Sequence, residues 1–255
     1  MRMKITESSG GVIRGSVSVY SIFKRYKRVR FYFPGDWHIG NPSHDAARFA
    51  RFVNHIKADS SAFAIGMGDY GEFALKNSKG VERTQSLSPI QQSVEIKKQL
   101  KSAKRFIALV IGNHDLRLLL EGVGDVTKSI ADELDLPCGR RLELAVEYSR
   151  GKFFEIACHH GDRAGSLIGM KNFMATTTAA LGVLADSHER YMMPLDQYGV
   201  TGRERVAIRG SSFLTEDAHL VSMATKNPPR FGVAMLTLHK NGTWNAGFWE
   251  DRDDN

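Results

Sequence analysis

The sequence predicts an α/β fold in which strands alternate with helices and a second sheet packs against the first. Short apolar runs end in polar loops that contain glycine, and a stretch with helical spacing follows most of them. Five such runs occur, at residues 29–33, 62–67, 106–111, 153–158 and 181–185. Continuous apolar runs of this length are typical of strands that are buried on both faces, so we expect a largely parallel sheet covered by helices.

The remaining elements follow from periodicity and turn residues. Apolar spacing of 3 and 4 predicts helices at residues 44–57, 89–104, 116–120 and 168–180. Residues 11–21 alternate and carry β-branched side chains, which predicts a strand or hairpin. Three further strands are predicted at residues 206–209, 231–238 and 243–248, with a hairpin turn at Asn241-Gly242. We expect these C-terminal strands to form the second sheet.

Composition limits the classes of protein that the chain can belong to. Its 255 residues, 42% hydrophobic and 25% charged, suit a single globular domain spanning residues 1–255. The N-terminus has no apolar segment of the signal-peptide kind, no apolar run reaches membrane-spanning length, and only two cysteines occur. We therefore expect a soluble cytoplasmic protein without disulfides; a protein encoded by a virus or phage would have the same properties.

The chain is basic, with a formal net charge of +7. Such an excess favours anionic partners such as nucleic acid or phosphate esters. A protein that is merely basic is an equal alternative, because the charges are spread widely. The one dense basic run covers residues 24–30.

Polar side chains with metal-binding chemistry follow four of the apolar runs. Asp36 and His38 follow the first run, Asp69 the second, Asn113 the third and His160 the fourth. In parallel sheets ligands bind beyond the carboxyl ends of the strands, which is where these loops lie. Carboxylate, imidazole and amide groups together suit Mn, Fe, Zn or a similar divalent ion. Each residue alone could be a turn or a helix cap, but the ordered set predicts a metal site.

These motifs resemble the signature of the calcineurin-like metallophosphoesterases. That family carries Asp-x-His, Gly-Asp, Gly-Asn-His-Asp/Glu, His and Gly-His-x-His in this order. The matching segments here are Gly35-Asp36-Trp37-His38, Gly68-Asp69, Gly112-Asn113-His114-Asp115 and His160-Gly161. The resemblance covers residues 29–215 and implies a four-layer α/β/β/α fold, two mixed sheets flanked by helices, with the active site at the C-terminal strand ends.

The resemblance also implies two divalent metal ions, with Mn as the first choice and Fe, Zn, Mg or Ni as alternatives. Asp36, His38 and His188 would hold the first ion. Asp69 would bridge both ions, since a carboxylate has two oxygens. A water between the ions, with a lowered pKa, would be the nucleophile.

Asn113, His160 and Asp186 would hold the second ion. Asp186 departs from the family pattern, because Ala185-Asp186-Ser187-His188 stands where Gly-His-x-His is expected. A carboxylate in place of imidazole would favour Mn or Mg, or would weaken this second site. A competing placement of the last motif is residues 217–219.

His114 resembles the family's catalytic histidine, which protonates the leaving oxygen or stabilises charge on the phosphoryl group. Asp115 would orient His114 and stabilise its charge. His160 is preferred to His159 because the family's ligand directly precedes glycine, and neighbouring strand residues point to opposite faces. Arg163 and Arg190 flank motif loops and are candidates for substrate binding, with solvated loop arginines as the alternative.

The function that this site predicts is hydrolysis of a phosphoester. The basic charge favours a phosphodiester substrate in nucleic acid or a nucleotide. A compact Ser/Thr-type protein phosphatase, or another phosphomonoesterase, is the alternative within the same chemistry. A non-catalytic metal-binding scaffold is the alternative of another class, and Asp186 is the feature that permits it.

Overall fold

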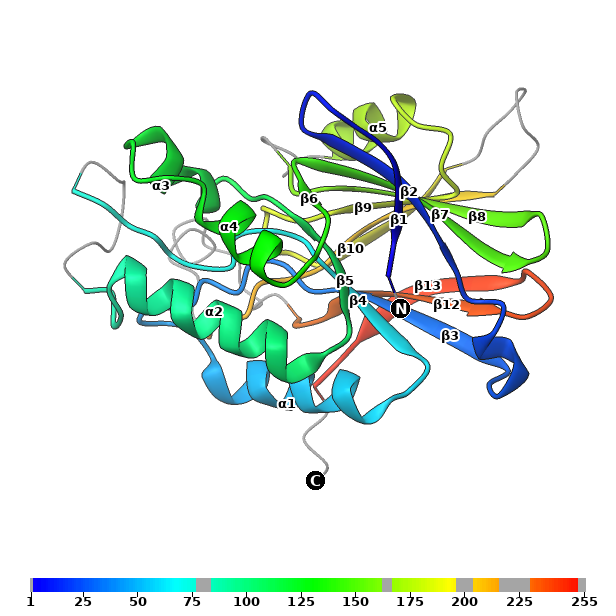
Figure 1. Ribbon diagram of the computed structural model, residues 1–255, viewed down its shortest axis with the longest axis horizontal. Coiled ribbons are helices and arrows are strands. Elements are labelled where there is room, and N and C mark those ends of the chain that lie inside the picture. Colours follow the sequence, from blue (N-terminus) through cyan, green and yellow to red (C-terminus); the bar gives the residue numbers. More distant parts are fainter. Residues whose placement is uncertain (1, 77–83, 162–166, 196–203, 216–229, 252–255) are drawn as a thin grey trace.

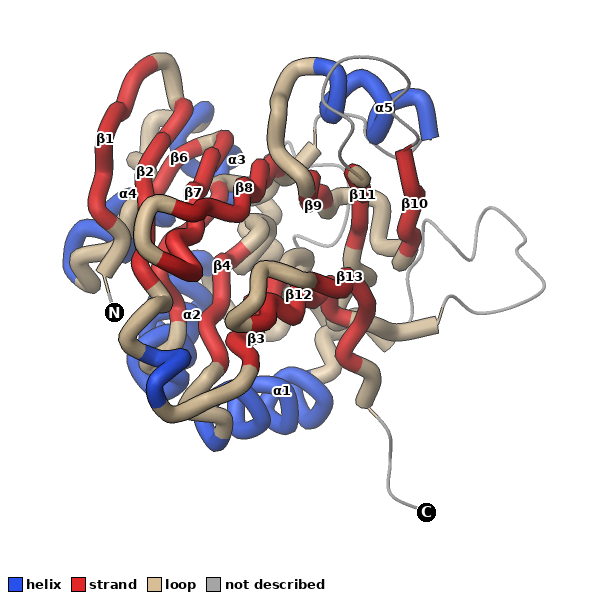
Figure 2. The backbone as a smooth tube through the Cα atoms, turned by 90° about the vertical axis from the view of Figure 1, so that its right-hand side faces the viewer, coloured by secondary structure: helices blue, strands red, loops and turns tan. Residues whose placement is uncertain are grey.

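A computed structural model describes residues 2–76, 84–161, 167–195, 204–215 and 230–251. Two mixed β-sheets pack face to face, and helices cover their outer faces (Figures 1 and 2). Helices α1 and α2 lie on one side of this sandwich and α5 lies on the other. The predicted four-layer α/β/β/α fold is therefore confirmed.

The six-stranded sheet has the order β13-β12-β3-β4-β5-β6. Its strands are β3 (Arg28–Phe33), β4 (Ala62–Gly66), β5 (Phe106–Val110), β6 (Cys138–Gly139), β12 (Val233–His239) and β13 (Trp244–Trp249). Strands β3 to β6 are parallel, and β12 is antiparallel to β3 and β13. Every residue of β4 and β5 is buried, which explains why these strands have continuous apolar sequences.

The seven-stranded sheet has the order β1-β2-β7-β8-β9-β11-β10. Its strands are β1 (Lys4–Ser9), β2 (Val12–Ser18), β7 (Arg141–Ser149), β8 (Lys152–His159), β9 (Leu181–Leu184), β10 (Tyr191–Leu195) and β11 (Arg205–Arg209). Strands β8, β9 and β11 are parallel to one another. Their carboxyl ends therefore meet at one edge of the sheet.

The helices are α1 (Ala46–Ala58), α2 (Pro89–Ala103), α3 (Asp115–Leu120), α4 (Val126–Glu133) and α5 (Leu167–Ala175), and a 3₁₀ turn η1 covers Ile22–Lys24. Ser88 and Gln91 form a reciprocal capping box that starts α2. A cluster of buried residues from α1, α2 and the six-stranded sheet includes Phe52, Ile56 and Leu100. None of the described helices is long and apolar enough to span a membrane.

The main core lies between the two sheets and joins residues such as Phe33 and Ile65 of one sheet to Ile156 and Val183 of the other. The loops that carry the predicted ligands follow strands of both sheets, and these strands are fixed to this common core. The core thereby brings loops from both sheets to one end of the sandwich.

The division of strands between the sheets differs from the prediction. The five apolar runs do not form one parallel sheet, because β3, β4 and β5 belong to the six-stranded sheet and β8 and β9 to the seven-stranded one. The C-terminal strands β12 and β13 extend the first sheet beside β3, and only β11 of the three predicted C-terminal strands belongs to the second. The second sheet is instead formed by the N-terminal hairpin and by strands from the middle of the chain. Apolar alternation predicts which face of a strand is buried, but it does not identify the partner strand, which is why the assignment was wrong.

Candidate metal centre

The predicted ligands lie on loops that leave the carboxyl ends of five strands. Asp36 and His38 follow β3, Asp69 follows β4, and Asn113 follows β5. His160 follows β8, and Asp186 and His188 follow β9. The structure brings all of these loops together between the two sheets.

The ligand loops have unusual backbone conformations. Positive φ angles occur at five of the predicted ligands: Asp36 (52°), His38 (49°), Asp69 (52°), Asp186 (72°) and His188 (60°). For residues with a side chain this left-handed region costs on the order of 1–3 kcal/mol and is concentrated at functional sites. In the turns at residues 36–38 and 186–188, the first and third residues have positive φ angles and the middle residue does not. This alternation allows the first and third side chains of each turn to point to one place.

Backbone hydrogen bonds hold these loops against each other. The amide of Asp36 donates to the carbonyl of Gly68 at 3.0 Å, and the amide of His38 donates to the carbonyl of Asp69 at 3.0 Å. An alanine Cβ at Gly112 would lie 2.2 Å from Oδ1 and 2.3 Å from the amide nitrogen of Asp69. Glycine at this position of the Gly-Asn-His-Asp motif is thus required by the close approach of the neighbouring Gly-Asp loop.

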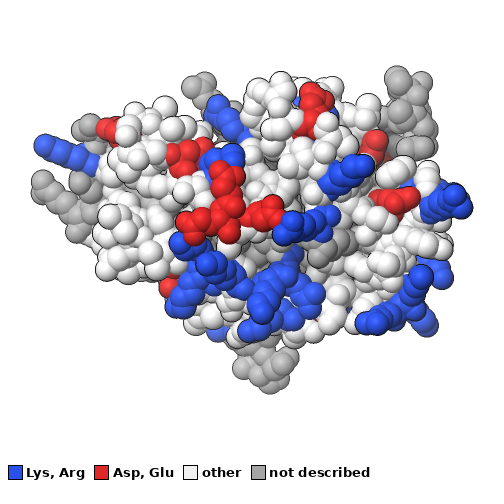
Figure 3. Space-filling model, viewed as in Figure 1, with Lys and Arg blue, Asp and Glu red and all other residues white. Residues whose placement is uncertain are grey.

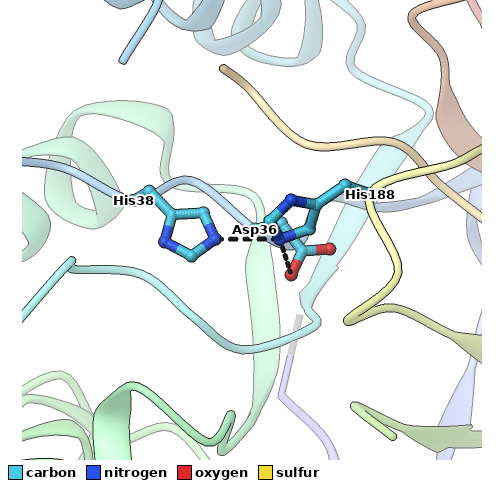
Figure 4. A group of neighbouring side chains, drawn as sticks. All are labelled: Asp36, His38 and His188. Atoms are coloured by element: carbon cyan, nitrogen blue, oxygen red, sulfur yellow. Dashed lines mark hydrogen bonds and ion pairs between the residues drawn. The ribbon is translucent and has the colours of Figure 1, made fainter. Parts of the chain in front are cut away.

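Asp36, His38 and His188 form the first group of converging ligand atoms (Figure 4). Nε2 of His38 lies 3.1 Å from Nε2 of His188, and the latter lies 3.7 Å from Oδ1 of Asp36. Asp36 is 1% exposed, and no donor among the described residues forms a hydrogen bond to its Oδ1. A buried carboxylate oxygen facing two imidazole nitrogens is the arrangement that a shared cation satisfies.

Asp69, Asn113, His160 and Asp186 form the second group. Nε2 of His160 lies 3.2 Å from Oδ2 of Asp69, 2.9 Å from Oδ1 of Asn113 and 3.9 Å from Oδ1 of Asp186. Nδ1 of His160 lies 2.6 Å from the carbonyl of Met67, so this nitrogen carries the donated proton. The Nε2 lone pair is thereby directed at the group, in the way that outer hydrogen bonds orient metal-binding histidines.

The amide of Asn113 provides a test of whether this group suits a cation. Its side-chain oxygen faces Oδ2 of Asp69 and Oδ1 of Asp186, each at 3.2 Å, in addition to Nε2 of His160. An amide turned by 180° would donate hydrogen bonds to all three atoms, whereas a cation among them requires the oxygen to face inward. With the amide oxygen inward and the ring of His160 deprotonated, this group would offer three oxygens and one nitrogen to a divalent ion.

Asp69 lies between the two groups, and its two oxygens have different surroundings. Oδ1 accepts a hydrogen bond from the backbone amide of His114 at 2.7 Å, which leaves Oδ2 to face the site. Burial alone would raise the pKa of Asp69, but His160 and His114 hold it well below its ordinary value. By contrast, burial and the carboxylates of Asp36 and Asp69 raise the pKa of Asp186. A bound cation would relieve this repulsion between carboxylates.

His114 lies beside the second group and is held by two neighbours. Its Nδ1 is 3.0 Å from the carbonyl of Glu72, and its Nε2 is 2.8 Å from NH2 of Arg117. Since a guanidinium can only donate, Nε2 accepts that hydrogen bond and the ring proton lies on Nδ1. Burial, together with the charges of His38 and Arg117, lowers the pKa of His114 to about 4. Its Nε2 is 3.9 Å from Oδ2 of Asp69.

The prediction that Asp115 orients His114 is wrong. The carboxylate of Asp115 accepts hydrogen bonds from the backbone amides of Asp69 (2.9 Å), Tyr70 (3.1 Å) and Gly112 (2.8 Å). Burial and the charge of Asp69 raise the pKa of Asp115 to about 7. The carboxylate therefore joins two ligand loops, because α3 begins at Asp115 and directs its side chain back under them.

Two residues of the site were missed in the sequence. Glu72 is 4% exposed; its Oε2 lies 3.1 Å from Nδ1 of His38 and accepts a hydrogen bond from Asn41 at 2.9 Å. Arg117 contacts His114 and donates to the carbonyl of Glu72 at 2.9 Å. Glu72 follows Asp69 by three residues and Arg117 follows His114 by three, so proximity to the motifs was the only signal available.

The other candidate residues lie in different surroundings. His159 lies on the opposite side of the chain from the ligand group, with its ring 5.9 Å from that of Phe173. Arg163 and the competing motif at 217–219 lie outside the described residues. The guanidinium of Arg190 donates to the carbonyl of Phe231 and to Glu250, and it lies 5.2 Å from the ring of Phe248. These contacts tie Arg190 to the C-terminal segment, so its guanidinium would have to leave them in order to bind substrate.

Comparison with known proteins finds matches only among solved structures. No family model and no curated protein matches the chain. The fold is similar to a single mutant of Vps29 from Entamoeba histolytica (13% identity, 88% of this chain and 100% of that chain, TM-score 0.48). It is also similar to the phosphoesterase YfcE from E. coli (14%, 86% and 98%, TM-score 0.47) and to a metallophosphoesterase from Sphaerobacter thermophilus (13%, 88% and 90%, TM-score 0.46).

Proposed function

We propose that this protein is a metal-dependent phosphoesterase. The observation that carries this proposal is that the carboxylate of Asp69 converges with two sets of ligand atoms, one from Asp36 and His160 and the other from His38 and His114. A pure structural ion site needs neither a second group nor an adjacent acid–base residue. Two divalent ions held there supply a Lewis acid for phosphoryl oxygens and lower the pKa of a water molecule.

The side chains of the protein contribute position and charge. Glu72 fixes His38 in the tautomer that directs Nε2 into the first group, and the carbonyl of Met67 does the same for His160. Asp115 joins the Gly-Asp loop to the Gly-Asn-His-Asp loop, which keeps Asp69 and Asn113 in register. We assign to His114 the transfer of a proton to the leaving oxygen through Nε2, which faces the site and must first take up that proton from solvent, because the ring proton of the neutral imidazole lies on Nδ1.

For the substrate we propose a phosphodiester in nucleic acid or a nucleotide. The support is the net charge of +7, which favours an anionic partner. Figure 3 shows Lys and Arg gathered over the region of α1 and α2, beside a compact group of Asp and Glu. The basic excess on this face is therefore mixed with acidic groups, and substrate preference must be decided by assay.

For the metal we propose manganese in at least the second group. That group offers three oxygens and one nitrogen, whereas the first offers one carboxylate and two imidazoles. Oxygen-rich ligand sets suit harder ions such as Mn²⁺ and Mg²⁺. Asp186, where the resembled family carries histidine, supplies the difference.

One observation favours a second candidate, a metal-binding scaffold without turnover. Nε2 of His114, the atom that would donate a proton, is occupied by the guanidinium of Arg117. An active enzyme must release this hydrogen bond during the reaction, whereas a scaffold need not.

Hydrolysis of bis-p-nitrophenyl phosphate and p-nitrophenyl phosphate, with and without added Mn²⁺, tests the proposal. We expect Mn-dependent turnover, with the diester exceeding the monoester. Turnover of the monoester alone would favour a phosphomonoesterase, including a compact Ser/Thr-type protein phosphatase. If two metal ions bind, as measured by elemental analysis, and neither compound is hydrolysed, the scaffold is the correct description.

A further inference from the structure

Arg117 occupies a position that structural stability alone does not explain. Its side chain, 22% exposed, extends from the short helix α3 back toward the metal ligands. NH2 donates to Nε2 of His114 at 2.8 Å, and NH1 donates to the carbonyl of Glu72 at 2.9 Å. NH1 is also 3.4 Å from the carboxylate oxygen Oε1 of Glu72. A permanent positive charge is thereby held against the imidazole that faces the two ligand groups.

The distances place this guanidinium within reach of a group bound at the site. Nε2 of His114 is the partner of Arg117 and lies 3.9 Å from Oδ2 of Asp69, a member of the second ligand group. Arginine is always charged and presents donors in a planar fork that matches two oxygens of a phosphoryl group. Its present partner, a neutral imidazole nitrogen, is a weaker acceptor than a phosphoryl oxygen.

We propose that Arg117 leaves His114 to bind a phosphoryl oxygen of the substrate, and that this arginine determines how well phosphomonoesters are hydrolysed relative to phosphodiesters. This proposal rests on the proposed phosphoesterase function. A diester has two non-bridging oxygens, whereas a monoester has three and carries more negative charge. A monoester therefore has an additional acceptor for the guanidinium, and it gains more from this arginine than a diester does.

Release of the hydrogen bond also affects His114. While Arg117 occupies Nε2, that atom cannot face a leaving oxygen. When the guanidinium moves to the phosphoryl group, Nε2 becomes free to take up a proton from solvent and pass it to the leaving oxygen, while Nδ1 keeps its own proton on the carbonyl of Glu72. Binding of the phosphoryl group and exposure of the histidine are thus coupled through a single side chain.

Three variants test the role of Arg117. Arg117→Met keeps the length of the side chain without charge, and Arg117→Lys keeps the charge without the planar fork. Arg51→Met is the control, since Arg51 lies on α1 and pairs with Asp251. The readout that is independent of turnover is the binding of inorganic phosphate to the Mn-loaded protein by isothermal titration, with metal content measured for each variant.

We expect Arg117→Met to weaken phosphate binding by about tenfold to a hundredfold, the loss typical of a charge-assisted hydrogen bond, with metal content unchanged. We expect the rate on p-nitrophenyl phosphate to fall at least about tenfold more than the rate on bis-p-nitrophenyl phosphate, with Arg117→Lys intermediate and Arg51→Met unaffected. Unchanged phosphate binding in Arg117→Met, or equal losses on the two substrates, would overturn the proposal. If the native protein hydrolyses neither substrate but binds phosphate through Arg117, the enzymatic function fails while the assignment of Arg117 as a phosphoryl-binding residue stands.

Discussion

Nδ1 of His38 lies 3.1 Å from Oε2 of Glu72, a residue 34 positions away, and both side chains are at least 95% buried. His38 belongs to the loop after β3, and Glu72 follows the loop after β4. The carboxylate fixes the ring so that Nε2 faces His188 and Asp36. Burial alone would raise the pKa of Glu72. The hydrogen bonds from His38 and Asn41 and the charges of His38 and His114 outweigh burial and lower this pKa to about 2.

We expect Glu72→Gln to weaken metal binding at the first group by about tenfold to a hundredfold, the usual effect of losing an outer carboxylate on a ligating histidine. Competition with a chromophoric chelator measures this affinity directly. Glu133→Gln, at an exposed glutamate on α4, is the matched control. Equal metal affinity in Glu72→Gln and the native protein would show that Glu72 does not orient His38.

Replacement of Asp186 tests the character of the second group. We expect Asp186→His to shift metal preference from Mn²⁺ toward Zn²⁺, because a second imidazole replaces a carboxylate oxygen. We expect Asp186→Ala to retain one ion and lose much of the other. Elemental analysis after loading with an equimolar mixture of the two metals gives both quantities. A Zn:Mn ratio unaffected by Asp186→His would place Asp186 outside the metal ligands.

His114→Ala should keep both metal ions and lose activity, because each ligand group has at least three other ligands and Nε2 of His114 is held by Arg117. We expect a rate loss of about 10²–10⁴ on alkyl phosphoesters, the range for a positioned acid. The loss should be much smaller on p-nitrophenyl esters, whose leaving group needs no proton. Loss of metal in this variant would instead assign His114 as a ligand.

Metal binding should strengthen as pH rises. Burial opposes protonation of His160, but the carboxylates of Asp69 and Asp36 outweigh it and raise the pKa of His160 well above its ordinary value. In the metal-free protein, protonated His160 therefore stabilises the fold below its unfolded pKa of about 6.5, and this contribution is lost as pH rises through the higher folded value. A metal ion requires the deprotonated ring, so it competes with the proton at low pH.

The difference in Tm between protein with Mn²⁺ and protein with a chelator measures this competition. We expect the difference to grow from about pH 6 to about pH 8, with a stabilisation of about 2.7 kcal/mol when free metal is a hundredfold above its Kd. If the difference in Tm stays constant or becomes smaller over this pH range, protonation of His160 does not compete with metal binding.

Gly112→Ala should disrupt the site through sterics alone. The added Cβ would lie 2.3 Å from the backbone nitrogen of Asp69, so the Gly-Asp loop would have to move. We expect loss of metal binding and a lower free energy of unfolding by about 1–3 kcal/mol, the cost of overpacking. Gly247→Ala is the control, because a Cβ there meets no atom within 4 Å. Equal effects of the two substitutions on metal binding and stability would exclude this packing role.

The sequence alone was sufficient for the elements that carry the ligands. The apolar runs of β3, β4, β5, β8 and β9 are buried and local, so composition and length identify them. Because parallel strands place their carboxyl ends at a common edge, the sequence predicted that the loops after β3, β4 and β5 lie close together; the loops after β8 and β9 reach them from the other sheet. Strand β7 and helix α4 were missed, although β7 alternates between buried and partly exposed residues.

Only the tertiary structure decided to which sheet each strand belongs and which side chains contact one another in the site. Strand β12 pairs with β3, more than 200 residues earlier in the chain. The carboxylate of Glu72 is hydrogen-bonded to His38, and that of Asp115 accepts hydrogen bonds from amides of another loop. The guanidinium of Arg117 donates to the nitrogen of His114 that faces the site. Residue type and spacing specify a ligand's chemistry and the strand end where it lies. The partner of a side chain depends on how separate loops pack, and that is set by the common core between the two sheets.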